Sequence, residues 1–103
     1  FQDIKGLVYS LDLKDPLVKA ASQLREKLAP DYLTTFADSY QGQLKIEYNQ
    51  QENRLIFYLA FNPQKPLRIQ DIVEEMLEIK NPVYALTREY LVFSQDTDSR
   101  GVA

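Results

Sequence analysis

The residue types that most often do chemistry in proteins are missing from this chain. Its 103 residues include no histidine and no cysteine. Histidine is the commonest general base and metal ligand near neutral pH, and cysteine thiolates supply nucleophiles and zinc ligands. The catalytic strategies that remain depend on carboxylate, lysine or tyrosine alone. We therefore predict a protein that is not an enzyme and that holds no metal and no cofactor.

Acidic residues are present, but their spacing is poor for a metal site. One stripe with spacings of three and four follows a predicted helix and consists of Asp71, Glu74, Glu75 and Glu78. Carboxylates spread along a helix do not converge on one ion, so a solvated face explains the stripe better than a cation site or a dock for a basic partner. The segment 96–98 has the first acids of a calcium loop but lacks its glycine and its terminal glutamate.

An aromatic series offers a different possibility. Tyr32, Phe36 and Tyr40 recur every four residues, and they could line a ligand pocket beside a carboxylate of raised pKa. Aromatic residues at helical spacing more often complete a core. A small-ligand-binding domain is therefore the second alternative function that we keep.

Charge and hydropathy narrow the class of protein further. The formal charge of −3 gives no net attraction to nucleic acid or to anionic lipid. No apolar run approaches the ~20 residues that cross a bilayer, and no stretch has the layout of a signal peptide. We expect a soluble protein in the cytoplasm. Because residue 1 is Phe and not Met, we also expect the natural chain to begin earlier.

The first half of the chain predicts a strand followed by a helix. Residues 4–11 are rich in aliphatic and aromatic residues and predict a strand, in which Gly6 suggests a bulge. Asp15 followed by Pro16 is typical of a helix start, and Pro30 ends that helix. The apolar residues of the helix at helical spacing are Leu17, Ala20, Ala21, Leu24 and Leu28. Segment 31–41 stays open between a short helix and an ordered loop.

The second half predicts two strands, a helix and a last strand. Apolar and polar residues alternate over 44–48 and 55–61, with a hairpin loop over 49–53. A helix then carries an apolar stripe of Ile69, Ile72, Val73, Met76 and Leu77. The last strand runs over 83–93, and Thr87-Arg88-Glu89 within it suggests a bulge or a sheet edge. Residues 1–93 form one α+β domain, and we expect 94–103 to be a flexible polar tail.

The order of these elements is β, α, β, β, α, β. It predicts a ferredoxin-like domain, with a four-stranded antiparallel sheet that carries both helices on one face and a possible extra short helix at 31–41. The other face is then open to solvent or to a partner. This topology hosts many unrelated functions, so the fold alone carries little functional information.

The open face is the predicted site of function. If Leu55, Phe57 and Leu59 point to the helices, then Ile56 and Tyr58 point outward, because strand side chains alternate. An apolar and aromatic centre with a charged rim is the usual composition of a protein interface. The residues that we place in this interface are Tyr9, Lys45, Arg54, Ile56, Tyr58, Tyr84 and Arg88.

Two segments resemble the signatures of the RNA recognition motif. Residues 54–61 resemble the octamer of the family's third strand at four places: a basic residue at the first, an aromatic residue at the fifth and the last, and an aliphatic residue at the sixth. They depart from it at Leu55, where the family has glycine, and at Ile56, where it has a stacking aromatic residue. Residues 8–13 resemble the first-strand hexamer at its first, second and last places. The resemblance covers about fourteen residues and implies that Tyr9 and Tyr58 stack on bases and that Arg54 contacts phosphate. Single-stranded RNA binding is therefore the first alternative function.

The function that we prefer is a noncatalytic interaction or regulatory module. The missing catalytic residue types and the apolar centre around Ile56 and Tyr58 favour it. We expect the exposed sheet face or a sheet edge to bind another protein or a second copy of the chain, with no membrane involved.

Overall fold

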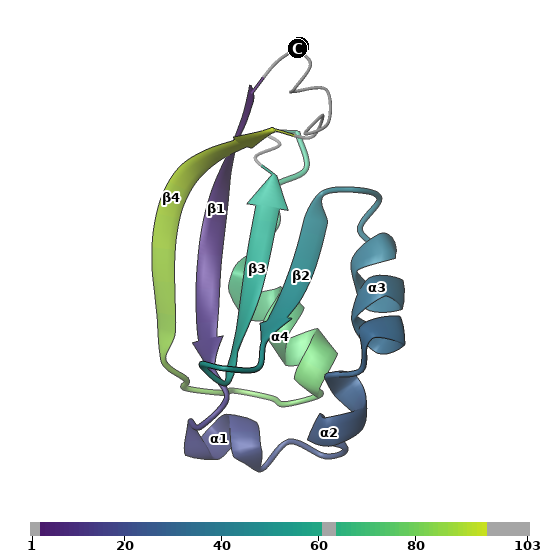
Figure 1. Cartoon of the computed structure of the whole chain (residues 1–103), viewed down its shortest axis with the longest axis vertical. Helices are drawn as coiled ribbons and strands as arrows, with labels where there is room; N and C mark the ends of the chain where they lie inside the picture. The colour runs from purple at the N-terminus through teal and green to yellow at the C-terminus, as the bar shows by residue number, and fades with distance from the viewer. Residues whose placement is uncertain (1–2, 61–63, 95–103) are drawn as a thin grey trace.

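Four strands and four helices make up the part of the chain that the structure describes. The computed structural model describes the backbone of residues 3–60 and 64–94, and the side chains of 6–60 and 64–89 (Figure 1). In chain order the elements are β1 (Asp3–Asp12), α1 (Pro16–Lys19), α2 (Leu24–Lys27), α3 (Pro30–Asp38), β2 (Leu44–Asn49), β3 (Arg54–Ala60), α4 (Ile69–Leu77) and β4 (Leu86–Ser94). Residues 95–103, which include most of the predicted tail, lie outside the described residues.

The strands form one antiparallel sheet in the order β2-β3-β1-β4. β1 lies between β3 and β4, and its pairing runs without interruption from Gly6↔Ala60 to Asp12↔Arg54 on one side. On the other side it runs from Asp3↔Ser94 to Leu11↔Leu86. An uninterrupted register leaves no extra residue at Gly6 or at 87–89, so the predicted bulges are wrong. The alternative for 87–89 is confirmed, because β4 is an edge strand.

One face of the sheet carries the core. In Figure 1, α4 passes behind the sheet, α3 lies beside β2, and none of the helices of the described residues covers the near face. Along β3 the burial alternates, and Leu55, Phe57 and Leu59 are buried as predicted. The apolar stripe of α4 meets them with four buried residues, Ile72, Val73, Met76 and Leu77. The near face is called the open face below.

The prediction of one continuous helix from Asp15 to Pro30 is wrong in the middle of that segment. The segment forms two one-turn helices, and Gln23 between them adopts a left-handed conformation with φ 57°. A continuous helix was predicted to bury Leu17, which is 40% exposed, whereas Val18 is completely buried. Helices this short are marginal in isolation, so tertiary packing of Val18 overrides the local preference. With α3 formed over Pro30–Asp38, there are four helices in the described residues where the sequence predicted two and a possible third.

Two charged side chains, Asp15 and Lys27, hold the short helices in place. Asp15 caps α1 through Oδ1, which accepts from Leu17 N at 2.9 Å, and its Oδ2 accepts from Ala85 N at 2.9 Å. Lys27 of α2 is 4% exposed, and its Nζ lies 3.1 Å from Oε2 of Glu78, the residue that ends α4 with φ 58°. Asp15 therefore fixes α1 to the segment before β4, and Lys27 fixes α2 to the end of α4.

No helix in the described part of the chain is long and apolar enough to cross a membrane.

Candidate open-face site

The strand register arranges the open-face side chains in rows that cross all four strands. One row contains, from β4 to β2, Glu89, Val8, Tyr58 and Lys45. The next row contains Thr87, Ser10, Ile56 and Glu47. Each row thus has one carboxylate at an edge, Glu89 on β4 in the first row and Glu47 on β2 in the second, so the two carboxylates lie diagonally across the apolar side chains of the central strands.

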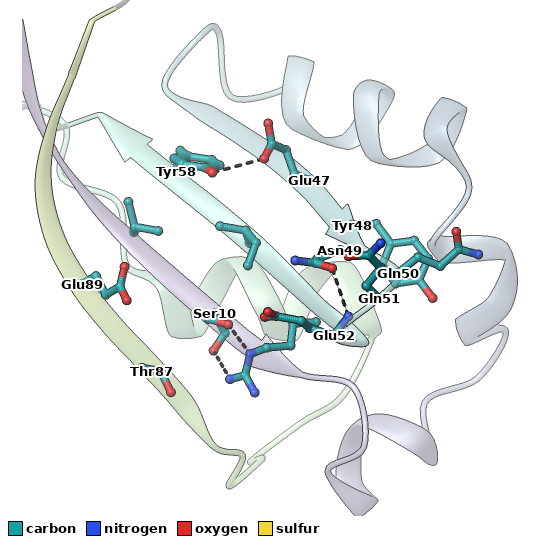
Figure 2. Close-up of a pocket in the computed structure, with 13 residues that line it drawn as sticks. Ser10, Glu47, Tyr48, Asn49, Gln50, Gln51, Glu52, Tyr58, Thr87 and Glu89 are labelled. Carbon is teal, nitrogen blue, oxygen red and sulfur yellow. Dashed lines mark hydrogen bonds between the residues drawn. The ribbon is translucent and has the colours of Figure 1, made fainter.

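These rows enclose a hollow of about 840 Å³, called the open-face hollow below (Figure 2). Its floor contains Val8, Ser10, Ile56 and Tyr58, and its sides contain Glu47, Arg54, Thr87 and Glu89. The hairpin closes one end with residues 48–52. Val8 is only 6% exposed although it lies outside the core cluster, because its neighbours in the rows surround it.

The hairpin at this end has a shape that its asparagines determine. Asn49 Oδ1 accepts from Glu52 N at 3.0 Å, and Asn53 adopts a left-handed conformation with φ 56°, which asparagine tolerates well. The predicted hairpin loop over 49–53 is confirmed, except that Asn49 is the last residue of β2; β3 begins at Arg54. The position of Gln50, Gln51 and Glu52 at the hollow follows from this turn.

Tyr58 is the centre of a polar cluster on the side of β2. Its hydroxyl donates to Glu47 Oε1 at 3.1 Å. Lys45 Nζ lies 3.3 Å from Glu47 Oε2 and 5.7 Å from the centroid of the Tyr58 ring, a cation–π geometry. Burial raises the pKa of Tyr58, and the charges of Glu47 and Glu89 raise it further. Glu47 and Glu89 therefore act on the same hydroxyl, one from β2 and one from β4.

Replacing Glu47 with glutamine should lower the pKa of Tyr58 toward its ordinary value. The decrease should be partial, because burial is the largest cause of the shift and the charge of Glu89 remains. A titration of the tyrosine ring carbons by NMR measures it. Glu52→Gln is the matched control, since Glu52 lines the same hollow without acting on Tyr58. An unchanged pKa in Glu47→Gln would contradict this account of the cluster.

Arg54 uses its charge within the protein. Its Nε donates to Ser10 Oγ, its Nη2 donates to the Ser10 carbonyl at 3.4 Å, and its Nη1 lies 4.0 Å from Asp12 Oδ2. The remaining charged residues that line the hollow are all acidic, namely Glu47, Glu52 and Glu89. The open-face hollow is therefore net negative, with apolar side chains in its floor.

Four of the seven predicted interface residues share the open face. Lys45, Arg54, Ile56 and Tyr58 come together there, as their alternation in β2 and β3 predicted. Tyr9 and Arg88 lie on the opposite face, because Tyr9 pairs with the buried Phe57 on one side and with Arg88 on the other. The expectation that they share a face with Tyr58 is wrong.

The sequence held a signal for the missed residues of β1. Ser10 and Asp12 are the polar members of an alternation that also contains Val8, and a shift of one residue moves a whole strand to its other face. To place Val8 on the open face, and Glu89 of β4 beside it, one has to know that β1 pairs with β4. That pairing joins the two ends of the described chain and has no local sequence signal.

Tyr84 lies before β4, half-buried against the core cluster. Its hydroxyl is buried and has no hydrogen-bond partner among the described residues. Burial, and then the charge of Glu74, raises the pKa of Tyr84 to about 12. A hydroxyl in such a place destabilises the fold, because folding removes its water without replacing the hydrogen bond.

Tyr84→Phe should therefore raise the free energy of unfolding by about 1 kcal/mol at neutral pH. The raised pKa means that the folded state favours the neutral phenol, a contribution that is complete below pH 10 and lost as pH approaches about 12. The variant should lose less stability over that interval than the wild type. Urea unfolding at several pH values measures both effects. Tyr40→Phe is the contrasting control, because it removes a 2.9 Å hydrogen bond to Glu75 and should not stabilise.

The three aromatic residues of the predicted ligand pocket pack in series along α3, with Phe36 between Tyr32 and Tyr40. The Tyr32 and Phe36 rings stack with centroids 6.2 Å apart, and Phe36 and Tyr40 follow at 5.4 Å. Tyr32 donates to the Met76 carbonyl at 3.2 Å, which joins α3 to α4. None of these aromatics lines the open-face hollow, the two hollows beside β2 or the one along the acidic stripe of α4.

Within the described residues, no three side chains of the metal-ligating types come together in a way that could hold an ion. The acidic stripe of α4 is largely solvated, since Asp71, Glu75 and Glu78 are exposed. Comparison of the chain with protein-family models, with curated proteins and with solved structures finds no match.

Proposed function

We propose that this chain is a noncatalytic interaction module that binds another protein in the open-face hollow. The observation that carries the proposal is the composition of this uncovered face. Apolar side chains on β1 and β3 form its centre, and charged side chains on β2 and β4 form its rim. An apolar centre with a polar rim is the usual anatomy of a protein interface.

The same proposal includes a ferredoxin-like classification of the fold. The strand order β2-β3-β1-β4 and the antiparallel pairing of all neighbouring strands support it. The helices α1 and α2 are additions in the connection between β1 and α3. Both larger helices leave the open face uncovered in this arrangement (Figure 1).

The proposal can be tested by placing a photoreactive amino acid at Ile56 in cells of the source organism. Illumination should give one dominant adduct, because Ile56 lies in the floor of the hollow. The same amino acid at Lys19, which is exposed on α1, is the positional control. The purified partner should then lose affinity when Tyr58→Ser removes the ring from the floor. Equal adducts at both positions, or an affinity that Tyr58→Ser leaves unchanged, would overturn the proposal.

Sedimentation analysis distinguishes a foreign partner from a second copy. A dimer that dissociates in Tyr58→Ser would identify the occupant of the hollow as another molecule of this chain. A monomer at high concentration would leave a foreign protein as the occupant.

No specific observation favours the RNA-binding alternative. It needs Tyr9 as a stacking residue, and Tyr9 lies on the helix-bearing face opposite Phe57. It also needs cations along the face, whereas the open-face hollow is net negative. A short single strand should show no affinity at low salt, where electrostatic binding is strongest.

A further inference from the structure

The open-face hollow also indicates the kind of protein segment that would fit it, an inference that rests on the proposed function. Its two rims carry Glu89 on β4 and Glu47 on β2, with the central strands β1 and β3 between them. Three strand spacings separate β4 from β2, which is roughly 14 Å. Glu89 and Glu47 belong to neighbouring rows, so they are also offset by two residues along the strands, and their separation is roughly 16 Å. In an extended peptide, side chains four residues apart point the same way and are separated by roughly 13 Å. A segment that crosses the strands obliquely therefore reaches both carboxylates when its outer side chains are long.

The apolar centre of the hollow would bind an apolar side chain of a ligand. Val8 and Ile56 lie on adjacent strands between the two carboxylates, and Tyr58 adds its ring beside them. An extended segment that presents its first and fifth side chains to the rims presents its third to this floor.

The carboxylates at the two rims would bind cationic side chains of a ligand. Glu89 is exposed and has no ion-pair partner among the described residues. Glu47 already accepts from the Tyr58 hydroxyl and pairs with Lys45, but the pair with Lys45 is exposed and contributes little stability, so a cation of a ligand can take the place of Lys45. Arg54 is the cation that lines the hollow, but its guanidinium is directed to Ser10 and lies 4.0 Å from the carboxylate of Asp12, which offsets its charge.

We propose that the open-face hollow binds an extended basic segment of a partner protein, with cationic side chains at its first and fifth positions and an aliphatic side chain at its third. The cations lie against Glu89 and Glu47, and the aliphatic side chain lies on Ile56 and the ring of Tyr58, beside the buried Val8. Lysine and arginine suit the outer positions well, because their aliphatic stems cover apolar surface while their charged ends stay hydrated.

A panel of blocked synthetic peptides tests this assignment on the whole chain by NMR titration of backbone amides. The peptide Lys-Ser-Leu-Ser-Lys should shift amides of residues 8, 56, 58 and 89. The peptides Lys-Ser-Ser-Ser-Lys and Ser-Ser-Leu-Ser-Ser should each bind about threefold or more weakly, and Glu-Ser-Leu-Ser-Glu should not bind. Added salt should weaken the binding of the basic peptides.

The chain contains its own control for unspecific attraction between charges. The acidic stripe of α4 carries four carboxylates, but it lies away from the apolar floor of the sheet. Glu89→Gln should weaken the binding of Lys-Ser-Leu-Ser-Lys about threefold. Asp71→Asn, the same change of charge on α4, should leave it unchanged. A surface glutamate such as Glu89 should tolerate this substitution, and a wild-type thermal transition confirms that the variant folds.

Each outcome decides the assignment. Shifts along α4 as large as those on the open face, or equal losses in Glu89→Gln and Asp71→Asn, would overturn it as unspecific attraction. Equal binding of the neutral or acidic peptide to the open face would overturn the basic segment while the proposed interaction site stands. If none of the peptides shifts amides of the open face, the basic segment is overturned as well. A specific photo-adduct at Ile56 would then show that the open face is still an interaction site.

Discussion

Replacing Glu78 with glutamine is expected to lower the free energy of unfolding by about 2 kcal/mol. Glu78 Oε2 lies 3.1 Å from Nζ of Lys27, whose side chain is 5% exposed. Removing one partner of such a pair leaves a charge without compensation in a place where water cannot replace it, which costs about 3–5 kcal/mol when both partners are buried. The Glu78 side chain is 69% exposed, so we take a smaller value.

Lys27→Met should be neutral or stabilising, because it removes the buried charge itself and keeps an unbranched side chain of similar length. In the double variant, Glu78→Gln should cost little, because the charge that needed Glu78 is gone. Urea unfolding of the four proteins gives the coupling energy. If Glu78→Gln costs the same with and without Lys27, the ion pair does not hold α2 against α4.

Replacing Asp15 with alanine is expected to have the second large effect, a loss of about 2–3 kcal/mol. Both oxygens of this carboxylate accept from backbone amides at 2.9 Å, one from Leu17 and one from Ala85. The cap alone is worth ~1 kcal/mol, and a hydrogen bond to a charged acceptor adds about 1.5–3 kcal/mol in favourable cases. For a chain of this size the melting temperature should fall by roughly 10 °C.

Asp15→Asn separates the two contacts. Asparagine caps helices as well as aspartate does, but its single oxygen cannot accept from both amides. The variant should therefore keep the cap, lose the bond to Ala85 N and show about half of the loss of Asp15→Ala. Thermal unfolding of both variants measures the difference. Equal losses in the two would assign the whole effect to the contact with Ala85.

Local patterns predicted most elements of the sheet side of the fold correctly. Alternation in β2 and β3 placed Lys45, Ile56 and Tyr58 on one face. Side chains of a strand can point only to one face or the other, and the apolar residues of each strand identify the face that is buried. The stripe of α4 was equally clear, since it buries a continuous face against the sheet.

The failures share a physical cause, which is that distant contacts decided the conformation. Nothing between Ala20 and Gln23 forbids a helix, and the break there follows from the burial of Val18 and Lys27 against other elements. Tyr9 was placed on the wrong face because the phase of β1 depends on strands far along the chain. The charge of the open-face hollow likewise depends on Glu89, which only pairing with β1 brings beside Val8.

The central position of β1 has a consequence for the order of folding. Among the four strands of this sheet β1 is synthesised first, and its neighbours lie at 54–60 and 86–94, so neither side of it can pair with them until much later segments are available. Closing such long loops costs chain entropy before any contact repays it, and domains rich in distant contacts fold slowly. During synthesis the sheet should therefore remain incomplete until β4 has left the ribosome, and until then one edge of β1 presents unpaired backbone amides and carbonyls.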